Sequence, residues 1–184
     1  QLCGFAKSDS SRDTPNLQFH IQPISTDKLG GANLHNFNAF TPTVANIRPT
    51  SRGEVYIASA DSRDDPKIKM NYLSTTEDRK VTAEGLKLIR KIVLETKAFE
   101  KYKPEEFRPG LNIQDNEELV KAASDYAQTI FHPVGTCKMG NDENSVVNDR
   151  LVARGLKNLR IVDASIMPNI TSGNTNAPTI MIAE

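Results

Sequence analysis

The sequence predicts an α+β domain built on a mainly antiparallel sheet with helices packed on it. Segments with the two-residue period of strands fill the chain up to Tyr72, and helical periods follow only after it. Strands grouped ahead of helices are typical of α+β rather than of alternating α/β folds. The composition, 38% hydrophobic and 25% charged, is that of a chain able to bury a core.

The strand-rich part begins with alternating apolar and polar residues over 17–24, which predict a half-buried strand. Gly30-Gly31 predicts a turn. Residues 34–47 contain more strand-like sequence, with Pro42 expected at an edge or a bulge. Three shorter features complete this part: a strand over 54–59, a polar turn over 61–66, and renewed alternation at Ile68, Met70 and Tyr72.

The helical part begins at Ser74-Thr75-Thr76-Glu77, which has the spacing of a capping box and predicts a helix from about 76 to 98. A second helix is expected to start at Asp115, and Pro133 should end it at Phe131-His132. Its apolar stripe consists of Leu119, Ala122, Ala123, Tyr126, Ala127 and Ile130.

The C-terminal part is expected to contain a short buried strand over 159–163 and a polar loop over 169–177. An apolar helical pattern then starts at Pro178 and stops at Glu184 without a cap. Because the chain also opens at Gln1 rather than at a methionine, we expect it to be a piece of a longer protein.

Charge and cysteine content exclude several classes of function. Lys plus Arg and Asp plus Glu both number 23, so no basic field favours nucleic acid or a membrane surface. The apolar runs are far shorter than the ~20 residues of a membrane span. Cys3 and Cys137 are too few for a disulfide framework or a metal site, which favours a reduced, cytoplasmic protein without a metal.

Three histidines are candidates for proton transfer near neutral pH. His20 alternates with Gln18 and Gln22, which favours a solvated position on a sheet, and His35 lies among asparagines and is expected to be structural. His132 differs because it precedes Pro133 and a glycine-containing segment, where a side chain can project while another surface comes close. Its position alone is equally consistent with an ordinary histidine at a helix end.

Other polar residues could contact a ligand. Cys137 could be a nucleophile, although a small buried residue is the more typical role of such a cysteine. The amides and hydroxyls of residues 169–178 could bind a polar ligand or form a surface turn, and Asp163 could be a ligand contact or a cap. No Gly-x-Gly-x-x-Gly occurs, so a dinucleotide-binding fingerprint is not on this chain.

Several longer motifs follow one another along the chain. They are Arg48-Pro49-Thr50-Ser51-Arg52-Gly53, Asn71-Tyr72-Leu73, Phe131-His132-Pro133-Val134-Gly135-Thr136-Cys137-Lys138-Met139-Gly140, Leu159-Arg160-Ile161-Val162-Asp163-Ala164, and Gly173-Asn174-Thr175-Asn176-Ala177-Pro178. In this order they resemble the C-terminal region of the glucose–methanol–choline (GMC) flavin oxidoreductases, and their wording is most like the choline-dehydrogenase branch. The resemblance covers about residues 45–184.

The resemblance implies that residues 1–184 are the substrate-binding, catalytic part of an FAD-dependent enzyme that oxidises an alcohol. Residues 159–184 would return to the FAD-binding domain, and a missing N-terminal part with the Gly-rich fingerprint would complete the fold. By motif position His132 is the catalytic base and Asn174 its partner. Asp163, Ala164, Thr175 and Asn176 would contact the FAD.

Two other functions are compatible with the same residues. The first is a non-catalytic binding or interaction domain on the same scaffold. The second is a hydrolase that uses Cys137 with His132.

Overall fold

The computed structural model of the chain describes residues 2–27 and 33–184, so the turn predicted at Gly30-Gly31 lies outside the described residues. The chain divides into two compact units. The first consists of Gln1–Thr50 with Leu73–Gln128, and the second of Ser51–Tyr72 with Thr129–Glu184.

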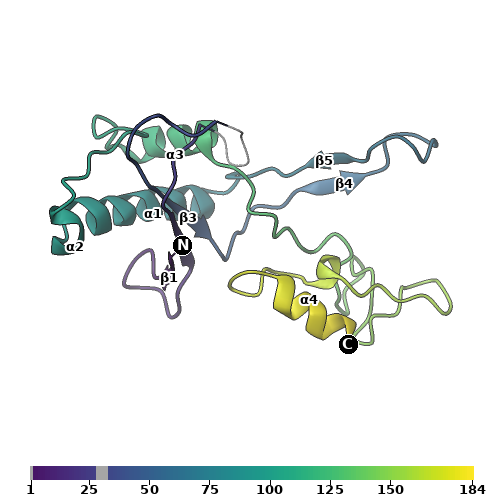
Figure 1. The fold of residues 1–184 in the computed structure, drawn as a ribbon. Helices are drawn as coiled ribbons and strands as arrows, with labels where there is room; N and C mark the ends of the chain where they lie inside the picture. The colour runs from purple at the N-terminus through teal and green to yellow at the C-terminus, as the bar shows by residue number, and fades with distance from the viewer. Residues whose placement is uncertain (1, 28–32) are drawn as a thin grey trace. The chain divides into compact units, whose positions relative to one another are not determined.

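The first unit contains a three-stranded antiparallel sheet in the order β1-β2-β3 (Figure 1). Its strands are β1 (Leu2–Ala6), β2 (Leu17–Gln22) and β3 (Thr41–Asn46). The strand predicted over 17–24 is confirmed, and Pro42 lies on an edge strand as expected. Strand β1 was not predicted. Of the strand-like segment predicted over 34–47, only Thr41–Asn46 forms a strand, and His35 stacks on Phe37 at 5.0 Å in the loop before it.

Helix α1 (Thr76–Leu94) begins close to where the sequence predicted it. Its N-cap is Thr75, whose hydroxyl accepts a hydrogen bond from Asp78 N, so the cap lies one residue after Ser74, where the expected capping box begins. The predicted continuous helix to 98 is wrong: Thr96 is extended and its hydroxyl binds Ile92 O at 2.6 Å. That bond satisfies a terminal carbonyl, and a separate turn, α2 (Lys97–Glu100), follows.

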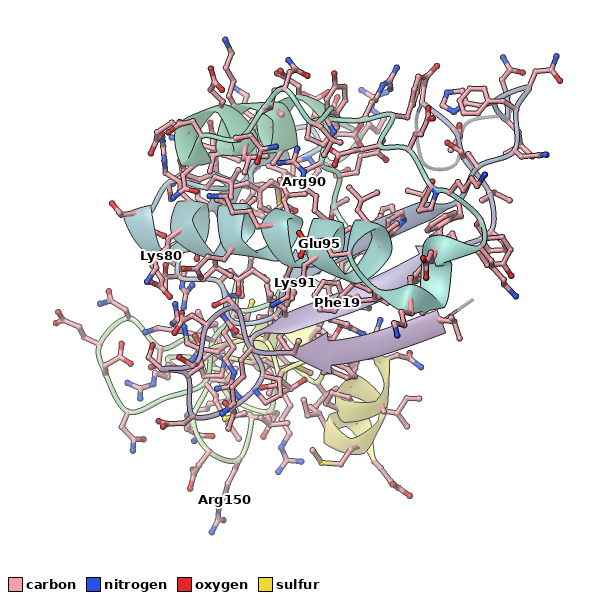
Figure 2. All side chains as sticks on the ribbon, turned by 90° about the vertical axis from the view of Figure 1, so that its left-hand side faces the viewer. Phe19, Lys80, Arg90, Lys91, Glu95 and Arg150 are labelled. Carbon is pink, nitrogen blue, oxygen red and sulfur yellow. The ribbon has the colours of Figure 1, made fainter. Side chains whose placement is uncertain are left out.

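Helix α1 lies between the sheet and α3 (Asn116–Tyr126), as Figures 1 and 2 show. Toward the sheet it packs Val81 against Leu17 and Phe19. Toward α3 it packs Ala83 against Leu119. Gly85 allows the close approach to the sheet, because a Cβ there would lie 3.1 Å from a methyl group of Val44.

Helix α3 ends at Tyr126, although the apolar stripe predicted a helix up to Phe131. Ala127 is already extended, with ψ 148°. Tyr126 and Ile130 are exposed, so the last turn of the predicted stripe has no surface to bury against and no packing to stabilise it. His132 is therefore not at a helix end.

The second unit contains a hairpin and a loop-rich segment with its own small core. The hairpin pairs β4 (Glu54–Tyr56) with β5 (Lys67–Lys69) in antiparallel register, shorter than the predicted strands. The expected buried strand over 159–163 is wrong: within the described residues Arg160 makes a single bridge to Val152, and Leu159 and Val162 are exposed.

The core of the second unit joins two segments that are distant in sequence. Cys137 N donates to Ser165 O at 2.9 Å, and Met139 N donates to Ile166 O at 2.8 Å. Beneath them Val147, Ile166 and Met167 are buried. The segment around residue 138 is thus held beside the short 3-10 helix η1 (Ala164–Ile166), a few residues before helix α4 (Asn176–Ala183).

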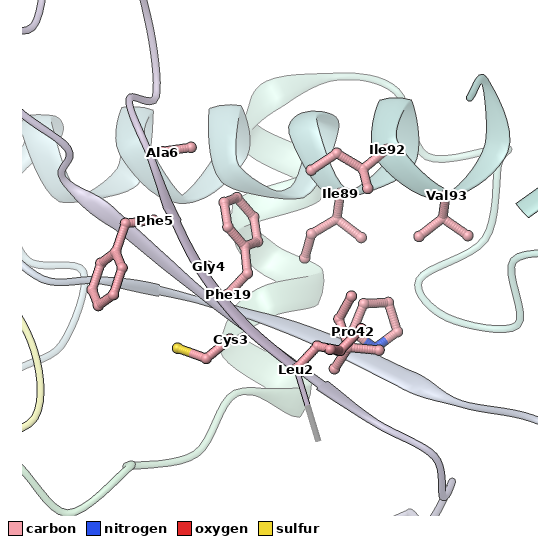
Figure 3. Close-up of a pocket in the computed structure, with 11 residues that line it drawn as sticks. Leu2, Cys3, Gly4, Phe5, Ala6, Phe19, Pro42, Ile89, Ile92 and Val93 are labelled. Atoms are coloured by element: carbon pink, nitrogen blue, oxygen red, sulfur yellow. The ribbon is translucent and has the colours of Figure 1, made fainter. Parts of the chain in front are cut away.

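The first unit also has an apolar hollow of about 270 Å³ between strand β1 and helix α1. In Figure 3, Phe19 from β2 and Ile89 and Val93 from α1 project into it. None of the predicted site residues lines it. Across the described residues, no helix combines the length and the apolarity that crossing a bilayer requires.

Candidate functional site

The backbone around His132 is shaped by two unusual residues. Phe131 has φ 62°, in the left-handed region that large side chains rarely adopt, and its N–H donates to Thr129 Oγ1 at 3.1 Å. Gly135 has φ 91°, and a Cβ at that position would lie 3.2 Å from Met167 O. These turns let the segment leave Pro133 and run directly beside η1.

The half-buried imidazole of His132 is held through both of its nitrogens by residues about forty positions further along the chain. The amide nitrogen of Asn174 lies 2.7 Å from Nε2. The hydroxyl of Thr175 lies 2.9 Å from Nδ1, and Thr175 N is 3.4 Å from the same atom. The imidazole and the carboxamide that the sequence singled out are therefore in direct contact.

The partners of His132 differ in exposure. Thr175 is buried, with only 6% of its surface exposed, whereas Asn174 is exposed. The site thus has a fixed inner side at Nδ1 and an open side at Nε2. An open ring nitrogen beside an amide can exchange a proton with a small polar molecule while the amide holds that molecule in place.

The other three predicted site residues lie at the starts of two helices. Asp163 is the exposed N-cap of η1, where its carboxylate accepts from Ser165 N at 2.7 Å, and Ala164 is the first residue of that turn. Asn176 is the first residue of α4. Asp163 thus has the capping role that its sequence position allowed.

Two features of the site were missed by reasoning from the sequence. The hydroxyl of Thr175 contacts the imidazole, although only a cofactor contact was expected of this residue. The left-handed backbone of Phe131 also carried no signal, because glycine and asparagine are the residues that mark such conformations.

The contacts of His132 do not support the alternative hydrolase site. Its ring nitrogens lie beside Thr175 and Asn174, and among the described residues neither is hydrogen-bonded to the thiol of Cys137. The backbone N–H of Cys137 instead donates a hydrogen bond to Ser165 O, and its side chain is a half-buried free thiol. This is the small structural role that the sequence favoured.

A comparison with known proteins decides the family. The family model described as GMC oxidoreductase matches residues 49–183, which include every residue of the candidate site. The chain belongs to the GMC oxidoreductase family. The resemblance to the C-terminal region of that family is thereby confirmed.

Curated relatives of this GMC oxidoreductase chain include two kinds of enzyme. It is 46% identical to an alcohol dehydrogenase [acceptor] from Pseudomonas putida over 98% of the chain. It is 42% identical to an oxygen-dependent choline dehydrogenase from Citrobacter koseri, again over 98% of the chain. The chain spans about a third of the length of these relatives, 32% in both cases.

Solved structures confirm the fold. The GMC chain superimposes on pyridoxine 4-oxidase from Mesorbium loti with a TM-score of 0.84 and 29% identity, over 98% of this chain and 36% of that one. It also shares the fold of a formate oxidase from Aspergillus oryzae, with a TM-score of 0.83, 24% identity, and coverage of 92% and 30%. The mixed arrangement of antiparallel strands and helices is therefore that of GMC oxidoreductase domains.

Proposed function

We propose that this chain is the substrate-binding, catalytic part of an FAD-dependent enzyme that oxidises an alcohol to an aldehyde or ketone. The observation that carries the proposal is the 2.7 Å contact between the Asn174 amide and Nε2 of His132. Residues 1–184 act with an N-terminal FAD-binding part, and residues 159–184 return to it. Choline and pyridoxine, which the names of two relatives specify, are both alcohols.

The donors and acceptors at the starts of η1 and α4 suit FAD. Thr175 is the N-cap of α4 but makes no side-chain capping bond, so its side chain does not compete with a ligand for the first-turn N–H groups of Asn176 and Ala177. A flavin ring carries carbonyl oxygens that accept such bonds. The exposed carboxylate of Asp163 and the N–H of Ala164 can meet hydroxyl and carbonyl groups of the rest of the cofactor. FAD, when bound, supplies the acceptor for a hydride.

Residues of this chain accept the hydroxyl proton of the alcohol. An alcohol becomes a carbonyl compound by losing a hydride from its carbon and a proton from its oxygen, and Nε2 of His132 takes that proton. A substrate hydroxyl at Nε2 replaces the bond from Asn174, whose N–H is then free to hold the substrate oxygen. The amide contributes by placement and adds no charge.

Replacing the base tests the proposal. In the full-length flavoenzyme His132→Ala should lower the turnover of alcohol by roughly 10²- to 10⁴-fold, the usual contribution of a positioned base. Flavin absorbance per protein should stay unchanged. The matched control is His35→Ala, since His35 lies in the first unit and binds Ser25 and Asp27 rather than the site. Near-normal turnover of His132→Ala would contradict the assignment.

A second measurement separates this function from a non-catalytic binding domain. The full-length protein should be yellow, and its flavin absorbance should bleach when an alcohol is added without oxygen. A flavin that stays oxidised with choline and with simple primary alcohols would favour the binding domain.

A further inference from the structure

We propose that Thr175 is a positioning residue, whose hydroxyl acts together with the Asn174 amide to fix the tautomer and the orientation of the His132 imidazole. The proposal rests on the proposed function and adds a residue that acts through the base. It starts from the 2.9 Å contact between the Thr175 hydroxyl and Nδ1, on the opposite side of the ring from Asn174.

The two short contacts select one tautomer of His132. An amide nitrogen can only donate, so the Asn174 amide 2.7 Å from Nε2 requires a lone pair on that nitrogen. In a neutral imidazole the proton then lies on Nδ1, which donates it to the Thr175 oxygen. The backbone N–H of Thr175 also points at Nδ1, but at 3.4 Å this donor lies beyond the usual range and is outweighed by the hydroxyl at 2.9 Å. Nε2 is therefore the unprotonated nitrogen, as a base requires.

The backbone of Thr175 is anchored to the first turn of α4. The Thr175 carbonyl accepts from Thr179 N at 3.0 Å and from the Thr179 hydroxyl at 2.7 Å. The residue is buried, and its branched Cβ restricts the side chain to few rotamers. Because the hydroxyl serves the imidazole, it does not cap its own helix, although threonine is a favoured capping residue.

The same bond favours the proton transfer. When Nε2 takes a proton the ring becomes a cation, and the bond from Nδ1–H to the Thr175 oxygen becomes charge-assisted and stronger. The hydroxyl thus stabilises the protonated ring more than the neutral one. An interaction that strengthens along the reaction raises the rate of the chemical step rather than substrate affinity.

Two variants separate the hydroxyl from the shape of the side chain. Thr175→Val keeps the branched shape and removes the oxygen, whereas Thr175→Ser keeps the oxygen. In the full-length enzyme, Thr175→Val should lower kcat roughly ten- to hundred-fold, as loss of a partner that orients a functional imidazole does. KM and flavin content should change little, and Thr175→Ser should retain most of kcat.

Nitrogen NMR of histidine-labelled full-length protein gives a readout that needs no turnover. The ring signals of His132, assigned by their loss in His132→Asn, should show the proton on Nδ1 in wild type and in Thr175→Ser. In Thr175→Val, Nδ1 loses its acceptor and faces only the backbone N–H of residue 175, which is a donor, so the proton should redistribute toward Nε2. An unchanged tautomer in Thr175→Val, or equal losses of kcat in the two variants, would overturn the proposal.

The two readouts also distinguish this inference from the proposed function. A tautomer that shifts in Thr175→Val while His132→Ala retains normal turnover supports the positioning role and refutes the base. A tautomer that stays the same, in an enzyme that His132→Ala inactivates, refutes the positioning role alone.

Discussion

At the scale of single residues, the candidate site depends on backbone conformations as much as on side chains. Phe131 adopts a left-handed conformation with φ 62°, and its ring is 77% exposed, so burial of the ring does not compensate the strain. The residue that follows it is His132. Strained residues persist where the surrounding structure imposes them, and they cluster at functional sites.

Phe131 can be tested by comparing two truncations. Phe131→Gly and Phe131→Ala both remove the exposed ring, but only alanine retains a Cβ that disfavours positive φ. The glycine variant should be more stable by about 1 kcal/mol, as measured by denaturant unfolding. An alanine variant as stable as the glycine variant would show that φ at this position is relaxed in solution.

The lowered pKa of the Asp142 carboxyl makes the stability of the folded chain depend on pH. Hydrogen bonds from the Ser145 hydroxyl and then from Lys138 lower its pKa to about 2. In the unfolded chain such a group has a pKa of about 3.9, so its stabilisation is complete above that value and is lost as the pH falls toward 2.

The expected result for Asp142→Asn is a pH-dependent difference in stability. Wild type should exceed the variant in unfolding free energy at neutral pH, and the difference should shrink as pH falls from about 4 toward 2. Unfolding curves at several pH values measure it. A difference that grows on acidification would contradict the assigned direction.

At the scale of elements, one buried ion pair joins helix α1 to the segment before α3. Arg90, which Figure 2 labels on α1, forms two 2.8 Å bonds to Glu106, and its remaining bonds go to the carbonyls of Gly110 and Ile113. Glu106 also accepts from Gly110 N at 3.0 Å. The guanidinium therefore organises the whole 106–113 segment rather than one contact.

Removing the guanidinium of Arg90 should lower the free energy of unfolding. Arg90→Met leaves the half-buried carboxylate of Glu106 and two carbonyls without their donor and should reduce the unfolding free energy by about 3–5 kcal/mol. The matched control on the same helix is Lys80→Met, which breaks a 3.6 Å pair between the exposed Lys80 and the half-buried Glu84 and should cost about 1 kcal/mol or less. Equal effects in a denaturant titration would show that the buried network contributes no more than a surface pair.

At the scale of the whole molecule, stability is distributed unevenly between the two units. The first unit has two layers of helix on a sheet, with Leu17, Val81 and Leu119 fully buried. In the second unit every residue of β4 and β5 is exposed. A two-stranded hairpin that buries no face is marginally stable in water.

Hydrogen exchange of the chain should reveal this contrast. Amides of α1 should exchange slowly, through opening of the first unit, while those at the pairing of Val55 with Ile68 should exchange close to the rate of an unfolded peptide. Mass spectrometry of timed digests measures both. Hairpin amides protected as well as those of α1 would contradict the assignment of low local stability.

The sequence alone determined the elements whose signals are local. A period of two residues located β2, capping residues located the starts of α1 and α3, and long motifs located His132 and Asn174. The same local signals predicted elements that are longer than the observed ones wherever packing is absent. The apolar stripe after Tyr126 and the segment from Leu159 to Val162 predicted buried structure, but Ile130, Leu159 and Val162 are exposed.

Only the tertiary structure decided how the parts of the site meet. The contact of Nε2 with Asn174 and of Nδ1 with Thr175 spans about forty residues, and it depends on backbone bonds from Cys137 and Met139 to η1. Such bonds are made by groups that every residue carries, so no side-chain pattern encodes them. The sequence alone identifies the imidazole and the amide as reactive groups. Which ring nitrogen of His132 faces Asn174 and which faces Thr175 follows only from their positions in the folded chain.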